Sequence, residues 1–472
     1  MKKSLFILFL YSLFSVSVYA REQILLKKWK FNFDEQTDAV KKDYDDSLWE
    51  DVIVPHDWAI DKPFDMRIDM QSVQVLEDGD KVPKKRTGRT GALPAFGVGY
   101  YRTSIKSSKD MSGKRIRIEF DGAMSFSKVY INGEFVGEWS YGYSSFTFDI
   151  TDVWNFNGEN IVAVRLENKS ESSRWYPGAG IYRNVRLVVT EPVSVDHWGT
   201  YVTTPVVSKK KGGINLETRI ANKTGGSVKV RLESLLMDEK GNLVTKTSST
   251  ENIKGDKCVF NQKLSVRNPE LWSVKNPYLY KVVSNVYVGD KLYDTYNTSM
   301  GFRSFKFDKD KGFFLNGENV KLKGVCLHHD LGPLGAAVNY RALERQLKIM
   351  QEMGCNAIRT SHNPPTPELL ELCDKMGFLV QVEAFDEWRI GKNRNGYNIL
   401  FDEWAERDLT AMIHRDRNHP SVIMWSIGNE VREQNYNKGA ETARFLTDIC
   451  HREDPTRPVT AGFNSHNNAI KN

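Results

Sequence analysis

The chain has 472 residues, of which 27% are charged and 40% are hydrophobic. This composition is typical of a soluble globular protein, and at roughly 150 residues per domain the length predicts about three domains. It excludes a disordered chain, a collagen-like chain and a coiled coil, and the negative mean hydropathy excludes a protein with many membrane spans. The formal net charge of +6, from 66 basic and 60 acidic residues, is too small and too dispersed to indicate a nucleic-acid partner.

The amino terminus differs from the rest of the chain. Lys2 and Lys3 precede an apolar stretch from Leu5 to Val18, and small residues follow where a signal peptidase would cleave. We therefore predict that residues 1–20 are a signal peptide and that the mature protein is periplasmic or secreted, with no membrane span. A retained membrane anchor is the alternative.

Five cysteines are present, and none forms a CxxC pair. An odd and sparse set in a chain of this size argues against a disulfide scaffold. Because no cysteine precedes Cys258, a bacterial lipoprotein attachment site is not expected.

Residues 21–190 consist of short stretches in which apolar and polar residues alternate. Residues 115–120 and 161–166 are expected strands, and Asn132-Gly133 lies where a two-residue hairpin turn requires positive φ. The pattern predicts an antiparallel β-sandwich. A long polar segment, Asp61 to Gly99, interrupts it, and we expect either a disordered or a functional loop there.

Residues 191–302 are again rich in expected strands, such as 228–232 and 278–288. A segment of this size and pattern is typical of an immunoglobulin-like sandwich. No internal repeat is visible in the chain.

From residue 303 onward, apolar runs alternate with amphipathic stretches. The expected strands are residues 320–327, 356–360, 378–385, 422–427 and 459–463, and the expected helices are residues 341–353, 367–376, 402–415 and 440–451. This order predicts a parallel sheet with right-handed crossovers. A barrel and an open doubly wound sheet both fit, but the absence of a GxGxxG motif or a P-loop disfavours a nucleotide-binding open sheet.

Polar side chains follow four consecutive expected strands of this region. They include His328, His362, Asp386, and the pair Asn429-Glu430. The carboxyl ends of barrel strands carry the functional residues, so we expect these side chains to form one site. Glu430 follows an apolar run, where burial would raise the pKa of its carboxyl group and allow it to donate a proton at neutral pH. Capping of the next helix is its alternative role.

The other candidates suit the binding of a sugar. The amide of Asn429 can donate to and accept from a hydroxyl group, and the carboxylates of Asp386 and Glu387 precede Trp388, whose indole could cover a sugar ring. His328 and His362 fit hydrogen bonding to a polyol better than metal binding, because their spacing meets no strong metal-site rule. The alternatives are packing at the barrel mouth for each histidine, a solvated loop for Asp386 and Glu387, and a turn residue for Asn429.

Several long motifs of the chain, in the same order, resemble glycoside hydrolase family 2, the family of β-galactosidases, β-glucuronidases and β-mannosidases. The resemblance covers nearly the whole chain after the signal peptide. It is carried by residues 55–58 (PHDW), 99–102 (GYYR), 175–183 (WYPGAGIYR), 276–280 (NPYLY), 323–329 (KGVCLHH), 356–364 (NAIRTSHNP), 374–377 (DKMG) and 415–430 (RDRNHPSVIMWSIGNE).

The resemblance implies a jelly-roll sugar-binding domain (21–190), an immunoglobulin-like domain (191–302) and a catalytic (β/α)8 barrel (303–472). It implies retention of anomeric configuration through a covalent glycosyl-enzyme, with Glu430 as the acid/base. Asn429 matches the partner of the sugar 2-hydroxyl, His328 and His362 match sugar contacts, and Arg174 is expected to reach the site from the jelly roll.

The resemblance also raises the question of a metal ion. In metal-dependent β-galactosidases of the family, an acid and a histidine after the third barrel strand hold magnesium, and here Arg389 stands near the position of that histidine. We therefore predict no metal and no other cofactor.

The barrel region is short for this fold. A closed barrel needs about 250 residues, whereas about 170 follow residue 302 and reach just past a fifth strand. In the family the nucleophilic glutamate follows the seventh strand. We therefore predict that the chain is truncated or incompletely sequenced, and that it is unstable or inactive by itself.

The function expected from the resemblance is that of an exo-β-glycosidase, a β-galactosidase above all. A β-glucuronidase, a β-mannosidase, a non-catalytic carbohydrate-binding protein and a structural cell-surface protein are the alternatives. The expected partner is a glycoside or oligosaccharide, and the sequence gives no prediction of oligomeric state.

Overall fold

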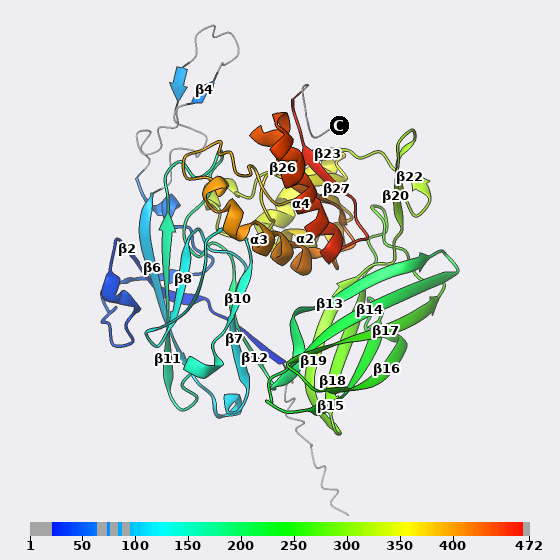
Figure 1. Ribbon diagram of the computed structural model, residues 1–472, viewed down its shortest axis with the longest axis horizontal. Helices are drawn as coiled ribbons and strands as arrows, with labels where there is room; N and C mark the ends of the chain where they lie inside the picture. Colours follow the sequence, from blue (N-terminus) through cyan, green and yellow to red (C-terminus); the bar gives the residue numbers. More distant parts are fainter. Residues whose placement is uncertain (1–20, 64–72, 76–83, 87–94, 466–472) are drawn as a thin grey trace, which may run out of the picture.

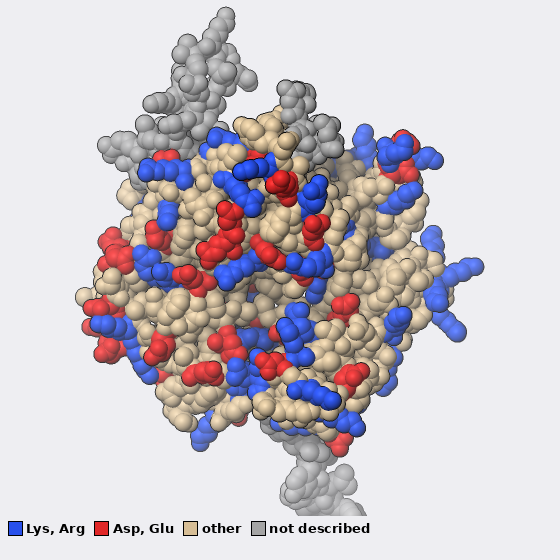
Figure 2. Space-filling view, viewed as in Figure 1, with Lys and Arg blue, Asp and Glu red and all other residues tan. Residues whose placement is uncertain are grey.

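A computed structural model describes residues 21–63, 73–75, 84–86 and 95–465 of the chain (Figure 1). The predicted signal peptide lies outside the described residues. Two β-sandwiches flank a third region, which joins parallel strands with helices and lies across the top of both (Figure 1). Figure 2 shows basic and acidic side chains interspersed over the viewed face. No helix among the described residues is long and apolar enough to cross a bilayer.

The first sandwich has a four-stranded sheet and a six-stranded sheet. The smaller sheet has the order β1 (Arg21–Leu25), β12 (Val185–Thr190), β7 (Arg115–Phe120) and β10 (Phe146–Asp149). The larger sheet has the order β3 (Glu50–Ile53), β2 (Lys28–Phe33), β6 (Gly97–Lys106), β11 (Glu159–Asn168), β8 (Ser127–Ile131) and β9 (Glu134–Trp139). All pairings are antiparallel, and the alternating apolar residues of both sheets meet in one core, as the sequence predicts.

Local turn chemistry explains the β8–β9 hairpin. Asn132 and Gly133 lie between the two strands with φ of 54° and 91°, the left-handed conformation that a tight hairpin turn requires. The prediction for this dipeptide is confirmed. The long segment from Asp61 to Gly99 contains one described hairpin, β4 (Val73–Val75) with β5 (Lys84–Arg86), and much of the segment lies outside the described residues.

The second sandwich is built from seven strands. One sheet has the order β13 (Val193–Val207), β14 (Lys211–Asn222) and β17 (Lys257–Arg267); the other has the order β16 (Leu243–Ile253), β15 (Val228–Met237), β18 (Tyr280–Val288) and β19 (Lys291–Met300). Every pairing is antiparallel, in agreement with the predicted immunoglobulin-like sandwich. A small sheet of β20 (Phe305–Asp308), β21 (Gly312–Leu315) and β22 (Glu318–Asn319) leads into the third region.

The third region is a five-stranded parallel sheet, in the order of the chain, with helices between the strands. The strands are β23 (Gly324–Leu327), β24 (Ala357–Thr360), β25 (Leu379–Glu383), β26 (Val422–Asn429) and β27 (Val459–Gly462); the helices are α1 (Tyr340–Glu352), α2 (Pro367–Met376), α3 (Phe401–Asp416) and α4 (Asn437–Glu453). The predicted alternation of strands and helices is confirmed, and the sheet is a partial (β/α)8 barrel.

The first sandwich and the partial barrel share a polar interface. Arg183, fully buried, follows the sequence WYPGAGIY of the sandwich and donates to the main-chain oxygens of Pro364 (2.9 Å) and Pro365 (3.1 Å) in the barrel. Asp57 accepts from the amide of Ala336 in the loop after β23. The segment around Arg174 is thereby held against the mouth of the barrel.

Candidate active site

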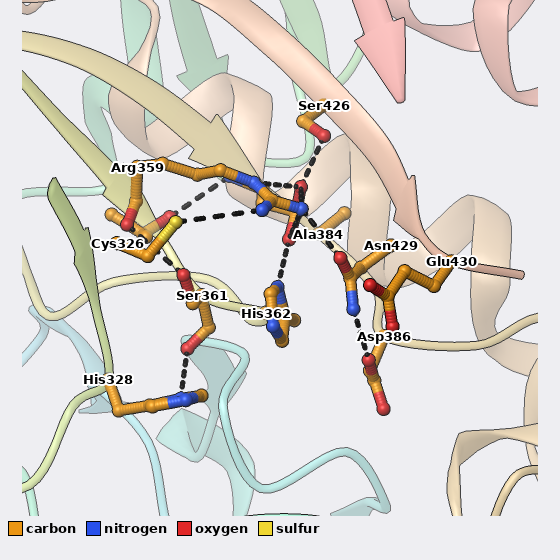
Figure 3. Close-up of polar contacts among 12 residues, drawn as sticks. Cys326, His328, Arg359, Ser361, His362, Ala384, Asp386, Ser426, Asn429 and Glu430 are labelled. Atoms are coloured by element: carbon orange, nitrogen blue, oxygen red, sulfur yellow. Dashed lines mark hydrogen bonds and ion pairs between the residues drawn. The ribbon is translucent and has the colours of Figure 1, made fainter. Parts of the chain in front are cut away.

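Successive parallel strands deliver the predicted site residues to one edge of the sheet. His328 follows β23, His362 follows β24, Asp386 follows β25, and Glu430 follows β26. Because the strands are parallel and adjacent, their carboxyl ends meet at the same edge. Figure 3 shows these side chains gathered there, together with Asn429. The prediction that they lie close together is confirmed.

The floor of the site is a buried ion pair. Arg359 on β24 donates through Nε (2.9 Å) and Nη2 (3.0 Å) to the two carboxylate oxygens of Glu383, the last residue of β25. The hydroxyl group of Ser426 on β26 donates to the same carboxylate at 2.5 Å. A buried charge is stable only when it is paired and hydrogen-bonded, and Glu383 meets both conditions. The network therefore fixes three neighbouring strands relative to one another.

His362 binds the same carboxylate. Its Nδ1 lies 2.6 Å from Oε1 of Glu383. Since a carboxylate that is paired with Arg359 can only accept, Nδ1 carries the proton and donates it. Nε2 is then the ring nitrogen that remains for a ligand.

His328 is oriented in a similar way. Its Nδ1 lies 2.8 Å from the main-chain oxygen of Ser361 and donates to it, so Nε2 is the acceptor. Burial lowers the pKa of His328, and the neighbouring ring of His362, whose centroid is 5.5 Å away, lowers it further. The indole of Trp175, from the first sandwich, stacks on the His328 ring at a centroid distance of 5.0 Å. His328 thus offers an acceptor nitrogen beside an aromatic wall.

Asp386 is held by donors from three directions. Arg174 donates through Nε (2.8 Å) and Nη2 (2.5 Å), the ammonium group of Lys392 lies at 2.9 Å, and the side-chain amide of Asn429 donates at 2.8 Å. Burial opposes ionisation of this carboxyl, but the hydrogen bond from Arg174 and the charges of Lys392 and Arg174 hold its pKa well below the usual value. Asp386 is therefore a fixed anion, and the prediction that Arg174 reaches the site from the first sandwich is confirmed.

Glu430 lies at the rim of this cluster. Its backbone has φ of 46°, and its amide donates to the main-chain oxygen of Gly462 at 2.5 Å. Oε2 lies 3.8 Å from Nη1 of Arg174, and 43% of the side chain is exposed. The expected burial of Glu430 was wrong, because the apolar residues of β26 face the core while the residue after the strand turns outward into the open mouth.

The expected sugar platform at Trp388 is also wrong. The Trp388 side chain is fully buried, and its indole N–H donates to the main-chain oxygen of Ile427 at 2.8 Å. Buried aromatic residues of the first sandwich, Tyr141, Tyr143 and Trp175, lie beside the site instead. A cavity of about 40 Å³ lies between Tyr141, Tyr143, Ser172, Ser173, Trp175, His362, Asp386, Glu387, Asn393 and Tyr397.

This geometry combines a half-exposed carboxylate, a fixed anion, two imidazoles and an aromatic wall. Comparison with known proteins assigns it to a family. The family models of glycosyl hydrolases family 2 match residues 23–192 (sugar binding domain), 194–303, and 308–472 (TIM barrel domain). The chain belongs to glycosyl hydrolases family 2. Its first sandwich is the sugar-binding domain of the family, and its parallel sheet is part of the family's TIM barrel.

Relatives in the family cover nearly the whole chain. Beta-galactosidase BoGH2A of Bacteroides ovatus is 44% identical over 472 residues, which cover 93% of this chain and 54% of that protein. A family 2 member from Bacteroides cellulosilyticus is 38% identical, with a TM-score of 0.88 over 95% of this chain and 57% of its own. Bacteroides uniformis beta-glucuronidase 2, covalently bound to cyclophellitol-6-carboxylate aziridine, is 28% identical, with a TM-score of 0.79 over 94% of this chain and 53% of its own. The chain spans about half the length of these relatives.

The residues near the expected magnesium position of the family do not fit a magnesium ion. The carboxylate of Glu387 is buried and accepts from the amides of Lys392 and Asn398. Arg389 donates to Asp402 and Thr442, and a cation cannot serve as a ligand. Among the described residues, no group of three or more His, Cys, Asp or Glu side chains is arranged to hold a metal.

Two basic residues of the site were missed in the sequence. Arg359 interrupts the apolar strand β24, and a charged residue inside a buried strand signals a partner across the sheet. Lys392 gave no such signal, since it lies in a polar loop after β25 and reaches Asp386 only through the fold.

Proposed function

We propose that the enzyme that contains this chain is a retaining exo-β-glycosidase that removes terminal β-linked sugars, β-galactose in particular. Membership of the family supports glycoside hydrolysis. The relative with 44% identity is named a β-galactosidase, which supports the choice of sugar. The observation that carries the proposal is the position of Glu430, half-exposed at the carboxyl end of β26 and beside the anion Asp386.

In this proposal Glu430 is the acid/base. It protonates the glycosidic oxygen as the leaving group departs and later removes a proton from the attacking water. Its exposure at the mouth suits this task, because the leaving group departs into solvent and the attacking water arrives from solvent. Asp386, Asn429, His328 and His362 accept or donate hydrogen bonds to the ring hydroxyl groups, and Trp175 covers one face of the sugar.

Retention requires a second carboxylate about 5 to 5.5 Å from the first. Glu383 and Asp386 are committed to Arg359 and Arg174, so neither is free to attack a sugar. We propose that the nucleophile follows a later barrel strand, beyond Asn472, and that residues 1–472 alone do not turn over substrate. The covalent complex of the B. uniformis relative supports a covalent mechanism by analogy.

The charges of the site favour a neutral sugar over a glucuronide. Each cation that contacts the site is already paired with a carboxylate, since Arg359 binds Glu383 while Arg174 and Lys392 bind Asp386. A uronic carboxylate would need a cation of its own to offset its desolvation. A β-glucuronidase would have to draw that cation from outside this cluster, and a β-mannosidase remains a further alternative.

Two experiments test the proposal on the complete enzyme, meaning a polypeptide in which the sequence that follows Asn472 completes the barrel. The first compares kcat/KM for aryl β-galactoside, β-glucuronide and β-mannoside. We expect the galactoside to be preferred by at least about tenfold, and preference for the glucuronide would overturn the sugar assignment. The second follows the anomeric configuration of the first product by NMR, and an α-product would overturn retention.

The proposal includes a location outside the cytoplasm. It rests on the apolar stretch from Leu5 to Val18 behind two lysines. Amino-terminal sequencing of the protein from its native host tests it. A mature amino terminus near residue 21 is expected, and a retained Met1 would contradict it.

A further inference from the structure

The ammonium group of Lys392 makes three hydrogen bonds. It donates to the main-chain oxygen of Asp386 (2.7 Å), to Oδ1 of Asp386 (2.9 Å) and to the main-chain oxygen of Asn429 (2.6 Å). An ammonium group has three N–H donors, so all of them are used. The side chain is 8% exposed, which makes this a fixed contact inside the site.

The bond to the Asn429 oxygen has a specific consequence for Glu430. The carbonyl of Asn429 and the amide of Glu430 belong to the same peptide group. The amide donates to the main-chain oxygen of Gly462 at 2.5 Å. Both polar atoms of that peptide group are thus held, one from the loop after β25 and the other from β27.

This peptide group sets the direction of the Glu430 side chain. Glu430 has φ of 46°, a left-handed conformation that is strained for a residue with a Cβ atom. Such a conformation persists only when its surroundings hold it. Among the described residues the carboxylate has one ion-pair partner, Nη1 of Arg174 at 3.8 Å, and it accepts no hydrogen bond there, so the backbone carries most of its orientation.

We propose that Lys392 is a positioning residue for the acid/base of the reaction: by holding the Asn429–Glu430 peptide group, it aims the Glu430 carboxylate at the glycosidic oxygen. The inference rests on the proposed role of Glu430. Arg174 also makes two hydrogen bonds to Asp386, so Asp386 keeps a cationic partner when Lys392 is removed. What Lys392 adds is the link between the loop after β25 and the end of β26.

The test uses the leaving group of the substrate, in the complete enzyme. An activated leaving group, such as dinitrophenolate, departs without protonation, whereas an unactivated one, such as methanol, needs the acid. A misdirected acid therefore slows only the hydrolysis of substrates with an unactivated leaving group. General loss of folded protein lowers both classes equally, so the ratio of the two kcat/KM values reports positioning and not stability.

We expect Lys392→Met to lower kcat/KM for an alkyl β-galactoside by about 10- to 100-fold relative to the dinitrophenyl substrate. Lys348→Met, on the exposed side of α1, is the matched control and should leave the ratio unchanged. If Lys392→Met does not fold, Lys392→Gln, which can reach one acceptor at a time, is expected to shift the ratio in the same direction.

Glu430→Ala is measured in parallel to separate the two claims. If Glu430→Ala changes the ratio and the folded Lys392 variants do not, the positioning role is wrong and the acid/base role stands. If Glu430→Ala leaves the ratio unchanged, the proposed function itself fails. An equal loss on both substrates in the Lys392 variants would also overturn the positioning role.

Discussion

The indole of Trp175 stacks on the imidazole of His328, with ring centroids 5.0 Å apart and an interplanar angle of 24°. Trp175 belongs to the sugar-binding domain and His328 follows the first barrel strand. One wall of the candidate active site is therefore made by two domains. The indole N–H donates to the hydroxyl oxygen of Tyr143 at 3.1 Å, which fixes the ring from behind.

Removing this wall should weaken sugar binding more than it alters chemistry. In the complete enzyme we expect Trp175→Ala to raise KM for an aryl β-galactoside several-fold, up to about tenfold, because the sugar ring loses a stacking surface worth about 0.5–1.5 kcal/mol. Trp175→Phe keeps an aromatic face, so its KM should lie between that of the parent enzyme and that of Trp175→Ala. Equal KM values for Trp175→Ala and the parent enzyme, with the variant folded, would show that this wall does not touch the sugar.

Asp57 joins the same two domains. Its carboxylate accepts from the amides of Ala59, Ala179 and Ala336 and from the hydroxyl group of Tyr176, at 2.7–3.1 Å. Gly335 packs so closely on Asp57 that a Cβ atom there would lie 2.5 Å from Oδ2. Three buried amides and one part-buried hydroxyl group depend on this one side chain.

We therefore expect Asp57→Ala to lower the thermal midpoint of the 472-residue chain by several degrees, because each buried donor left without a partner costs about 1–3 kcal/mol. Asp61→Ala, an exposed acid nearby, is the control and should change the midpoint little. Differential scanning calorimetry measures both. An unchanged midpoint for Asp57→Ala would contradict the role of this contact in joining the domains.

Asp408 on α3 predicts a pH dependence of stability. It is fully buried and accepts from Trp139 Nε1 (2.8 Å), Ser144 Oγ (2.7 Å) and Tyr397 OH (2.6 Å). Burial raises the pKa of this carboxyl to about 7, and the three hydrogen bonds offset the effect only in part. Because the folded protein then holds a proton that the unfolded chain releases near pH 4, stability falls as the pH rises from about 4 to about 7.

Asp408→Asn removes this titration. Its urea midpoint should therefore vary less between pH 4 and pH 7 than that of the parent chain, with the largest gain in stability at the higher pH. Asp448→Asn, on the exposed side of α4, is the matched control. If the urea midpoints of the parent chain and Asp408→Asn changed with pH in the same way, the prediction would be contradicted.

Much of the architecture could be predicted because it depends on local patterns. The alternation of residues 115–120 predicted β7, the Asn132-Gly133 pair predicted a hairpin, and α2 begins and ends at the residues expected from its apolar spacing. The meeting of His362 and Glu430 at one sheet edge followed from the parallel order of the strands. These features can be predicted from neighbouring residues in the sequence and from the rule that the carboxyl ends of parallel strands lie at one edge of the sheet.

The wrong and missing predictions depend on directions that the sequence does not encode locally. Trp388 and Glu430 each follow a strand of the same sheet, yet one points into the core and the other into the mouth. Lys392 and Arg174 lie in loops of two different domains and meet only at Asp386. Contacts of this kind depend on the conformation that each loop adopts in the tertiary fold, which the local sequence does not determine.

The central claim is that Glu430 donates the proton, and it is tested most directly by Glu430→Ala in the complete enzyme, with and without azide. We expect kcat/KM for an alkyl β-galactoside to fall by about 10²- to 10⁴-fold, while formation of the glycosyl-enzyme from the dinitrophenyl substrate persists. Azide, which needs no base, should then restore turnover of the activated substrate and yield a β-galactosyl azide. Full activity on the alkyl substrate, or the absence of any azide product, would contradict the account.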